Sequence, residues 1–252
     1  LRGNEVEENT TRQMLKAPRE SYTKSLWAVR SFQRKQKSLA KAEATPVISV
    51  QNVTAAYGKN EPVVRNVSFD IHAGRTVAVV GESGSGKSTA ARCITGLLPP
   101  LSGSISFNGT PLPPDYRNRS NDQLRQIQMI YQMADTALNP RRKIGEIIGR
   151  PVEFYRGLTG QAKRRRVEEL LAQIELEPGE FIDRYPSEVS GGQKQRIGIA
   201  RALAAEPKFV ICDEVTSALD QLVAEGILRL LTDLQDKMHL SFMLITHDLS
   251  TV

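Results

Sequence analysis

The chain of 252 residues is poor in cysteine, histidine and tryptophan, and it has no long apolar run. The two cysteines, Cys93 and Cys212, stand far apart within apolar segments. We therefore expect buried free thiols and neither a metal cluster nor a disulfide framework. No segment approaches the roughly 20 apolar residues that a membrane-spanning helix requires. No apolar stretch follows the polar start at Leu1, which argues against a secretory signal peptide, and the lack of an initial methionine suggests a fragment.

The bulk composition is that of an ordinary globular protein, with 40% hydrophobic and 25% charged residues. The length suits one large domain with an appendage. Much of the positive excess, a formal net charge of +6, lies in two clusters, Arg141–Lys143 and Lys163–Arg166. A solvated basic face is the simplest interpretation, and contact with anionic lipid or with nucleic acid is the alternative. Because no aromatic residues are interleaved, the clusters do not suit the stacking of bases.

A glycine-rich loop stands between the apolar run 76–80 and a helix predicted over about 87–98. It consists of Gly81, Glu82, Ser83, Gly84, Ser85, Gly86, Lys87, Ser88 and Thr89. Strand, glycine-rich turn and helix N-terminus together favour phosphate binding, because backbone N–H groups and the helix dipole both attract anions. We expect Lys87 to reach the β- and γ-phosphates of a nucleotide and the Ser88 hydroxyl to bind Mg²⁺. A merely flexible glycine loop is the alternative.

The order of the remaining segments predicts an α/β fold whose sheet has a parallel centre. Before the loop, partial alternation predicts strands at 47–50, 53–57 and 63–71, and after it Ser104–Phe107 and Asn108-Gly109 predict a hairpin. Residues 122–176 are mainly helical by their periodicity. A further helix is expected from Gly191 to Leu203, and wholly apolar runs at 209–212 and 242–245 predict strands buried on both faces.

Two acidic residues follow the apolar run 209–212 directly. A carboxylate at the carboxyl end of a central parallel strand lies where such sheets bind ligands. We expect Asp213 to hold Mg²⁺ and Glu214 to act as general base toward the attacking water. An acidic pair that only caps the next turn is the alternative.

A second anion site is expected about a hundred residues after the loop, at Ser190, Gly191, Gly192 and Gln193. One nucleotide does not need two such sites on one chain. The economical explanation is that this segment serves a nucleotide bound by a partner. An ordinary helix cap is the alternative.

From about Val47 onward these motifs resemble, in order and spacing, the ABC-type ATPases, the nucleotide-binding domains of ABC transporters. The loop matches Walker A, residues 209–214 match Walker B with its catalytic glutamate, and residues 190–193 match the signature motif. The resemblance implies a P-loop NTPase fold of ABC type. Its mixed sheet core would carry an antiparallel β subdomain and a helical subdomain, over about 122–190, that holds the signature.

The resemblance also assigns roles to four residues that mean little alone. Gln132 matches the Q-loop glutamine, which helps to hold Mg²⁺ and to align water, and His247 matches the switch histidine. Asp220 belongs to the D-loop match Ser217–Asp220. Tyr57 matches the aromatic that stacks on adenine. Taken singly, Tyr57 is more often a half-buried strand tyrosine and His247 a structural histidine.

Two positions depart from the family pattern. Val215 stands where the family usually has proline, and Val189 where it usually has leucine. Neither position supplies a reacting group, so we expect altered packing and retained chemistry.

Residues 137–148 and 185–188 are similar to segments of the oligopeptide, dipeptide and nickel importers. The resemblance implies ATP and Mg²⁺ as ligands, a second ATPase domain and two transmembrane permease subunits as partners, and a solute-binding protein acting indirectly. It places the chain peripherally on the cytoplasmic face of the inner membrane, with Arg141 and Arg142 near the membrane side. No nucleic-acid partner is expected, and the cargo stays open among peptides, glutathione-like compounds and nickel chelates.

Residues 1–45 differ in composition from the rest. Gly3–Glu8 and Ala17–Leu26 resemble the tail of a domain of this same branch, with a possible helix at 22–40 and a charged linker up to Pro46. We therefore expect a tandem protein in which 1–45 ends one ATPase domain and 46–252 forms a second one, truncated at its C-terminal end. An unrelated N-terminal extension is the alternative.

Two other functions are alternatives. A soluble ABC-type ATPase acting on ribosomes or DNA is compatible with tandem domains and positive charge. Against it, the interval from Gln132 to Ser190 is too short for a long coiled coil, and zinc-binding cysteines are missing. A small-molecule P-loop kinase would leave the signature and the D-loop unexplained.

Overall fold

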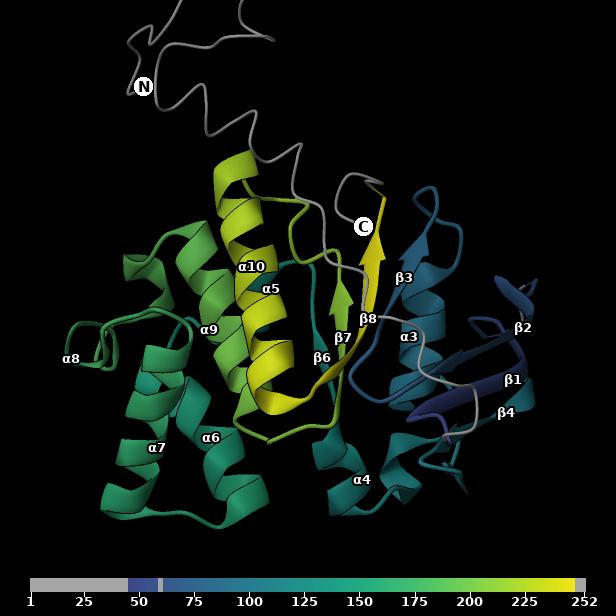
Figure 1. Ribbon diagram of the computed structural model, residues 1–252, viewed down its shortest axis with the longest axis horizontal. Coiled ribbons are helices and arrows are strands. Elements are labelled where there is room, and N and C mark those ends of the chain that lie inside the picture. The colour runs from purple at the N-terminus through teal and green to yellow at the C-terminus, as the bar shows by residue number, and fades with distance from the viewer. Residues whose placement is uncertain (1–44, 59–60, 248–252) are drawn as a thin grey trace, which may run out of the picture.

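The computed structural model describes residues 45–58 and 61–247. The segment predicted as a domain tail, with its helix at 22–40, lies outside the described residues, as do the residues after His247. Figure 1 shows three parts side by side: an antiparallel sheet, a parallel sheet in the middle, and a group of helices on the opposite side. The fold is α/β, as predicted.

The antiparallel sheet has the strand order β2-β1-β4-β5. Its strands are β1 (Ile48–Ala55), β2 (Val64–Ile71), β4 (Ser102–Phe107) and β5 (Thr110–Pro111). In β1 the side chains of Ile48, Val50 and Val53 are buried, whereas Gln51 and Asn52 are exposed, which is the pattern of a sheet with one buried face. The hairpin predicted at Asn108-Gly109 is confirmed by the pairing of β4 with β5.

The central sheet is parallel throughout, with the order β3-β8-β7-β6. Its strands are β3 (Thr76–Val80), β6 (Ile127–Ile130), β7 (Phe209–Asp213) and β8 (Ser241–Thr246). Every residue of β7 and β8 is buried, because helices and the other sheet cover both faces. Phe209 and Ile211 join the core beneath α3 and β1, and Val210 and Cys212 join the core beneath the helices.

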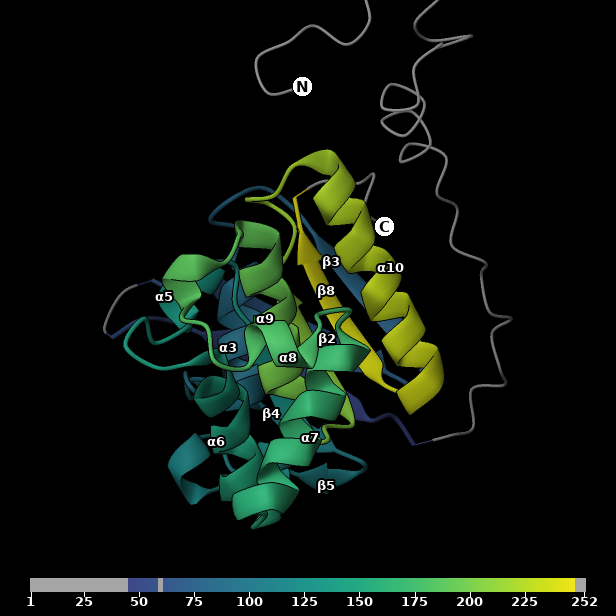
Figure 2. The same cartoon turned by 90° about the vertical axis from the view of Figure 1, so that its left-hand side faces the viewer.

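Two helices flank this sheet. The helix α3 (Lys87–Thr95) follows β3, and α10 (Gln221–Met238) lies along the opposite face beside β8, as Figures 1 and 2 show from two sides. Leu230 and Leu234 of α10 pack in the same core as Phe242 and Leu244 of β8. In the described residues no helix is long and apolar enough to span a bilayer.

The helical part is built around α9 (Gly191–Leu203), whose predicted position is confirmed. The other helices are α4 (Asn121–Gln126), α5 (Ala134–Ala137), α6 (Ile144–Arg156), α7 (Gly160–Gln173) and α8 (Pro178–Phe181), with 3-10 turns at Tyr116–Asn118 and Pro186–Glu188. The stretch expected to be mainly helical from about residue 122 contains one strand. Residues 127–130 form β6, which is hydrogen-bonded to β7 in the parallel sheet.

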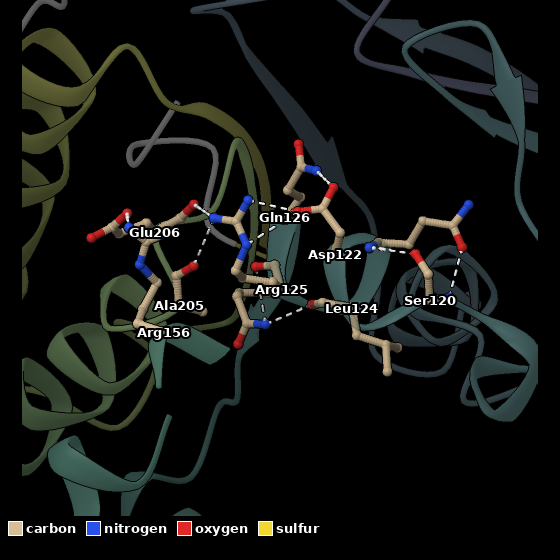
Figure 3. A network of polar contacts seen from close by, with 10 residues as sticks. Ser120, Asp122, Leu124, Arg125, Gln126, Arg156, Ala205 and Glu206 are labelled. Atoms are coloured by element: carbon tan, nitrogen blue, oxygen red, sulfur yellow. Dashed lines mark hydrogen bonds and ion pairs between the residues drawn. The ribbon is translucent and has the colours of Figure 1, made fainter. Parts of the chain in front are cut away.

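A polar network joins α4 to the loop that precedes β7 (Figure 3). Arg125 forms an ion pair with Asp122 at 2.7 Å and donates to the carbonyls of Ala205 at 3.3 Å and Glu206 at 3.1 Å. The Glu206 carboxylate in turn lies 3.4 Å from Arg156 at the end of α6. The loop is therefore fastened to α4 on one side and to α6 on the other.

The predicted basic clusters are largely paired with acidic residues. The pairs are Lys163–Glu153, Arg164–Glu168, Arg166–Glu169, Arg166–Glu206, Arg142–Glu146 and Lys143–Asp183. Most of these side chains are well exposed, so each pair contributes little stability. The clusters thus have the character of a solvated, charge-balanced helix surface.

Both cysteines are buried and free, as predicted. Burial raises the pKa of the Cys93 thiol to about 11 and that of Cys212 to about 12. Since the thiolate is the reactive form, both are inert at neutral pH.

Candidate functional site

The glycine-rich loop connects β3 to the N-terminus of α3 and is held by Lys87. Its ammonium donates to the carbonyl of Gly81 at 2.8 Å and to that of Glu82 at 2.7 Å. An ammonium has three N–H donors, so one is left for a ligand in the loop. Gly86, the N-cap of the helix at φ 95°, also lies close to the start of β2. An added Cβ would stand 3.1 Å from the carbonyl oxygen of Val63 and 3.2 Å from Val64 Cγ2. Any other residue there would be strained and crowded.

Ser88 and Asp213 meet at the bottom of this loop, although 125 residues separate them. The Ser88 hydroxyl donates to the Asp213 carboxylate at 2.9 Å. Burial raises the pKa of Asp213, the Ser88 hydrogen bond opposes this, and the charge of Glu214 raises the pKa further. A carboxylate whose charged form is disfavoured in this way gains from a nearby cation.

Glu214, Gln132 and His247 are also brought together. The Gln132 side-chain amide donates to Glu214 Oε2 at 2.9 Å, and His247 Nδ1 lies 3.4 Å from the same oxygen. The three residues follow β6, β7 and β8, which are neighbours in the parallel sheet. Their meeting therefore follows from the strand order, since the carboxyl ends of parallel strands share one edge.

The backbone of Glu214 is in the left-handed region, at φ 49°, which is uncommon for a residue with a side chain. Its N–H donates to the Ile245 carbonyl at 3.0 Å, and its own carbonyl accepts from the Ser217 backbone and hydroxyl at 3.1 and 3.0 Å. Val215, in the place of the usual proline, is 2% exposed and fills the core beneath. The turn that aims Glu214 is thus held by hydrogen bonds and packing.

Ser217 is a site residue that the sequence reasoning did not assign, although it lay within the D-loop match. Its hydroxyl accepts from the Gln132 amide at 3.2 Å while donating to the Glu214 carbonyl. It therefore links the segment after β6 to the segment after β7. Its spacing of three residues from Glu214, typical of a turn-closing serine, was the available signal.

Tyr57 lies beside α3 with 37% of its surface exposed. Its hydroxyl is 3.3 Å from Thr89 Oγ1 and accepts from Arg92 Nη1 at 2.8 Å. The aromatic ring predicted to receive a base is thus placed next to the helix that begins with Lys87. Arg92 was missed, although its spacing from Thr89 puts both on one face of α3.

The signature segment forms the start of α9 and satisfies itself locally. The Ser190 hydroxyl accepts from the Gln193 N–H at 3.3 Å, and the Gln193 side chain accepts from the Ser190 N–H at 2.9 Å. In residues 45–58 and 61–247, neither side chain forms a hydrogen bond with the phosphate loop. Gly192 is needed for close packing, because an added Cβ would stand 2.5 Å from Val223 Cγ1 of α10.

Asp220, predicted to take part in nucleotide binding, caps α10 by accepting from the Val223 N–H at 3.1 Å. Its role toward a nucleotide stays a prediction. Within the described ranges, no group of three or more His, Cys, Asp or Glu side chains could hold a metal. Ser88 and Asp213 still suit Mg²⁺, which binds through one or two protein oxygens, water and substrate phosphates.

Comparisons with known proteins agree with this geometry. Residues 64–217 match the family model described as ABC transporter. The chain is 46% identical over 190 residues to an oligopeptide transport ATP-binding protein of Haemophilus influenzae, covering 75% of this chain and 57% of that protein. A protein of the same description from Bacillus subtilis is 43% identical over 194 residues, again with 75% and 57% covered. The chain thus spans somewhat more than half the length of these relatives.

Solved structures give the same answer. A dimeric ATP-binding cassette in a post-hydrolysis state, bound to ADP and Pi, superposes with a TM-score of 0.70 at 32% identity, covering 81% of this chain and 89% of that one. A Clostridium perfringens protein described as part of an ABC transporter complex also reaches 0.70, at 28% identity, with 81% and 79% covered.

Proposed function

The chain belongs to the ABC transporter family, and on that premise we propose that it binds and hydrolyses ATP to energise the import of peptides or related small solutes across a membrane. The observation that carries the proposal is the meeting of Ser88, Asp213, Glu214, Gln132 and His247 at one edge of the parallel sheet. The names of the peptide-transport relatives support the cargo class. No observation favours the ribosome- or DNA-directed alternative.

In this proposal Tyr57 receives the adenine ring and the loop Gly81–Thr89 receives the phosphates. The third donor of Lys87 binds a β- or γ-phosphate oxygen, while its other two donors keep it anchored to the loop. The Ser88 hydroxyl and the Asp213 carboxylate would hold Mg²⁺, with Gln132 contributing its side-chain oxygen. When bound, the metal neutralises charge on the phosphates.

Hydrolysis depends on the group around Glu214. Its carboxylate accepts a proton from the attacking water, and Gln132 and His247, both already at Glu214 Oε2, hold it in place and orient the water. Ser217 fixes Gln132 relative to the turn that carries Glu214. Catalysis here relies on positioning and charge stabilisation, since phosphoryl transfer needs little covalent chemistry from the protein.

We propose that the signature segment acts on a nucleotide held by a second ATPase domain. Ser190 and Gly191 are exposed at the start of a helix of 13 residues, where N–H groups and the helix dipole attract phosphate. Asp220 follows Leu219, whose side chain lies beside Gly191, and would belong to the contact between the domains. The dimeric cassette among the similar structures supports this arrangement. Closing and reopening of the two domains would drive two permease subunits at the cytoplasmic face of the membrane, and a solute-binding protein would deliver the cargo.

A crosslinking experiment tests the shared site. One cysteine is introduced in the phosphate loop, by Ser83→Cys, and one in the signature segment, by Ser190→Cys. Both are made in the Glu214→Gln variant, in which hydrolysis is slow. The native cysteines are buried and inert, so they do not interfere. We expect a disulfide-linked dimer that forms with ATP and Mg²⁺ and is absent without nucleotide. Monomeric, concentration-independent ATP hydrolysis at full rate would contradict the shared site, as would crosslinking that ignores nucleotide.

A further inference from the structure

Arg92 stands at the junction between the ring of Tyr57 and the phosphate end of the site. Its Nη1 donates to the Tyr57 hydroxyl at 2.8 Å, and its guanidinium carbon lies 5.8 Å from the centre of the ring. That distance is within the range of a cation–π contact. Arg92 therefore holds Tyr57 by its hydroxyl, with the positive charge beside the ring.

A second contact on the same helix completes the support. Thr89 is 5% exposed, and its Oγ1 lies 3.3 Å from the Tyr57 hydroxyl. Thr89 and Arg92 are three residues apart on α3 and so share one helix face. Tyr57, by contrast, lies in the segment after the end of β1 at Ala55, outside any strand or helix. Its hydroxyl is thus fastened to the helix whose first two residues are Lys87 and Ser88.

Because α3 is a rigid element of nine residues, it fixes the spacing between the ring and the phosphate-binding groups.

We infer that Arg92 is a positioning residue for base recognition: through α3 it sets Tyr57 at the distance from Lys87 and Ser88 that a nucleoside triphosphate spans. This inference rests on the proposed function. It concerns the base end alone, so it predicts a change in the preference for ATP over a ligand that has the triphosphate without the base.

The test compares the Kd of ATP with that of inorganic triphosphate, both with Mg²⁺, for the 252-residue chain and its variants. Effects on the metal or on the loop cancel in the ratio of the two constants. We expect Arg92→Ala to raise the Kd of ATP about fivefold, which is the effect of losing one or two hydrogen bonds. The Kd of inorganic triphosphate should change by less than about twofold. Tyr57→Phe, which keeps the ring and removes the hydroxyl, should lose a similar part of the ATP preference.

The double variant Arg92→Ala with Tyr57→Phe separates positioning from a general effect. If Arg92 acts through the Tyr57 hydroxyl, the double variant loses little more than either single one. Arg164→Ala on α7 removes the same charge at an exposed ion pair and should leave both constants unchanged. If Arg92→Lys restores most of the preference for ATP over triphosphate, the positive charge beside the ring contributes to holding Tyr57.

Each other outcome overturns a distinct claim. Equal weakening of ATP and triphosphate by Arg92→Ala, or an unchanged ratio, refutes the positioning role while leaving the proposed function intact. A wild-type chain that does not prefer ATP over triphosphate refutes the assignment of Tyr57 as the base platform, and with it this inference.

Discussion

The phosphate-loop region and the signature region are both helix N-termini suited to anions, but their side chains are engaged in opposite ways. Around the loop, hydrogen bonds link residues that are 82 to 125 positions apart, as in Gln132–Glu214 and Ser88–Asp213. In the signature region the bonds of Ser190 and Gln193 span three residues and stay within the cap. The first region is assembled by the fold of this chain. The second is rigid and faces outward, which is what a surface offered to a partner requires.

In the assembled region around the phosphate loop, Glu214→Gln should have the largest effect. The amide keeps the shape and a contact to Gln132, but it cannot accept a proton from water. We expect ATP binding to be retained and kcat to fall by about 10²–10⁴. Single-turnover hydrolysis and ATP-dependent dimerisation in gel filtration measure both effects. Hydrolysis at the wild-type rate would show that another residue is the base.

Lys87→Ala should affect binding more than chemistry. It removes a charged donor and also releases the carbonyls of Gly81 and Glu82. Charged hydrogen bonds contribute about 1.5–3 kcal/mol each, so we expect ATP affinity to fall by about 10- to 100-fold. Equilibrium binding of a fluorescent ATP analogue measures this. Lys237→Ala at the end of α10 is a matched loss of charge and should leave binding unchanged; a loss confined to kcat would contradict the assigned role.

Gly192→Ala tests whether the signature region owes its shape to close packing. The added methyl group would meet Val223 of α10, and overpacking of this kind costs about 1–3 kcal/mol. We expect a lower Tm in thermal denaturation. Adding Val223→Ala makes room for the methyl group and should recover most of the loss. If the double variant is no more stable than the single one, the contact with Val223 is not the cause.

Two substitutions of Ser190 separate capping from action on a partner's nucleotide. Ser190→Ala loses the cap and should destabilise the chain by about 1 kcal/mol. Ser190→Asp keeps a capping carboxylate, so stability should be retained, yet its charge would oppose a γ-phosphate and lower ATP hydrolysis about tenfold. Thermal denaturation and steady-state ATPase assays give the two readouts. A fully active Ser190→Asp variant would show that Ser190 only caps the helix and does not act on a partner's nucleotide.

Asp213→Asn returns to the assembled region and tests its electrostatic strain. The folded protein raises the pKa of Asp213, mainly by burial, so the charged form is less favourable in the folded than in the unfolded chain. The stabilising contribution of the neutral form is therefore fully present below the ordinary pKa of 3.8 and is lost as the pH rises through the higher pKa of the folded protein. We expect Asp213→Asn to have a higher Tm than wild type at neutral pH, with little difference in acid. A lower Tm at neutral pH would contradict this sign.

The sequence predicted the elements and most of the site because the motifs sit at element boundaries. The apolar runs at 209–212 and 242–245 predicted buried strands, and the structure places Glu214 and His247 directly after them. By contrast, β6 lies within the region predicted to be mainly helical. The strand Ile127–Ile130 has four residues, which are too few to show the alternation typical of a strand. Its pairing with β7 is a long-range contact that local pattern cannot reveal.

The roles missed at Ser217 and Arg92 have the same origin. Both residues act on a group that is distant in sequence or outside any regular element, Gln132 in one case and Tyr57 in the other. A serine or an arginine has many possible partners, and composition does not choose among them. These contacts depend on how the fold places α3, β6 and β7 relative to one another.

The side-by-side ends of β6, β7 and β8 have a consequence for how this protein tolerates insertions. Successive side chains of a strand point to opposite faces, so one extra residue within Phe209–Asp213 would turn its remaining side chains over and shift Glu214 away from Gln132 and His247. Lengthening Gly157–Thr159, between α6 and α7, changes no such register. Added residues at that turn should therefore leave the site intact, whereas even one added residue within the three strands should disrupt it.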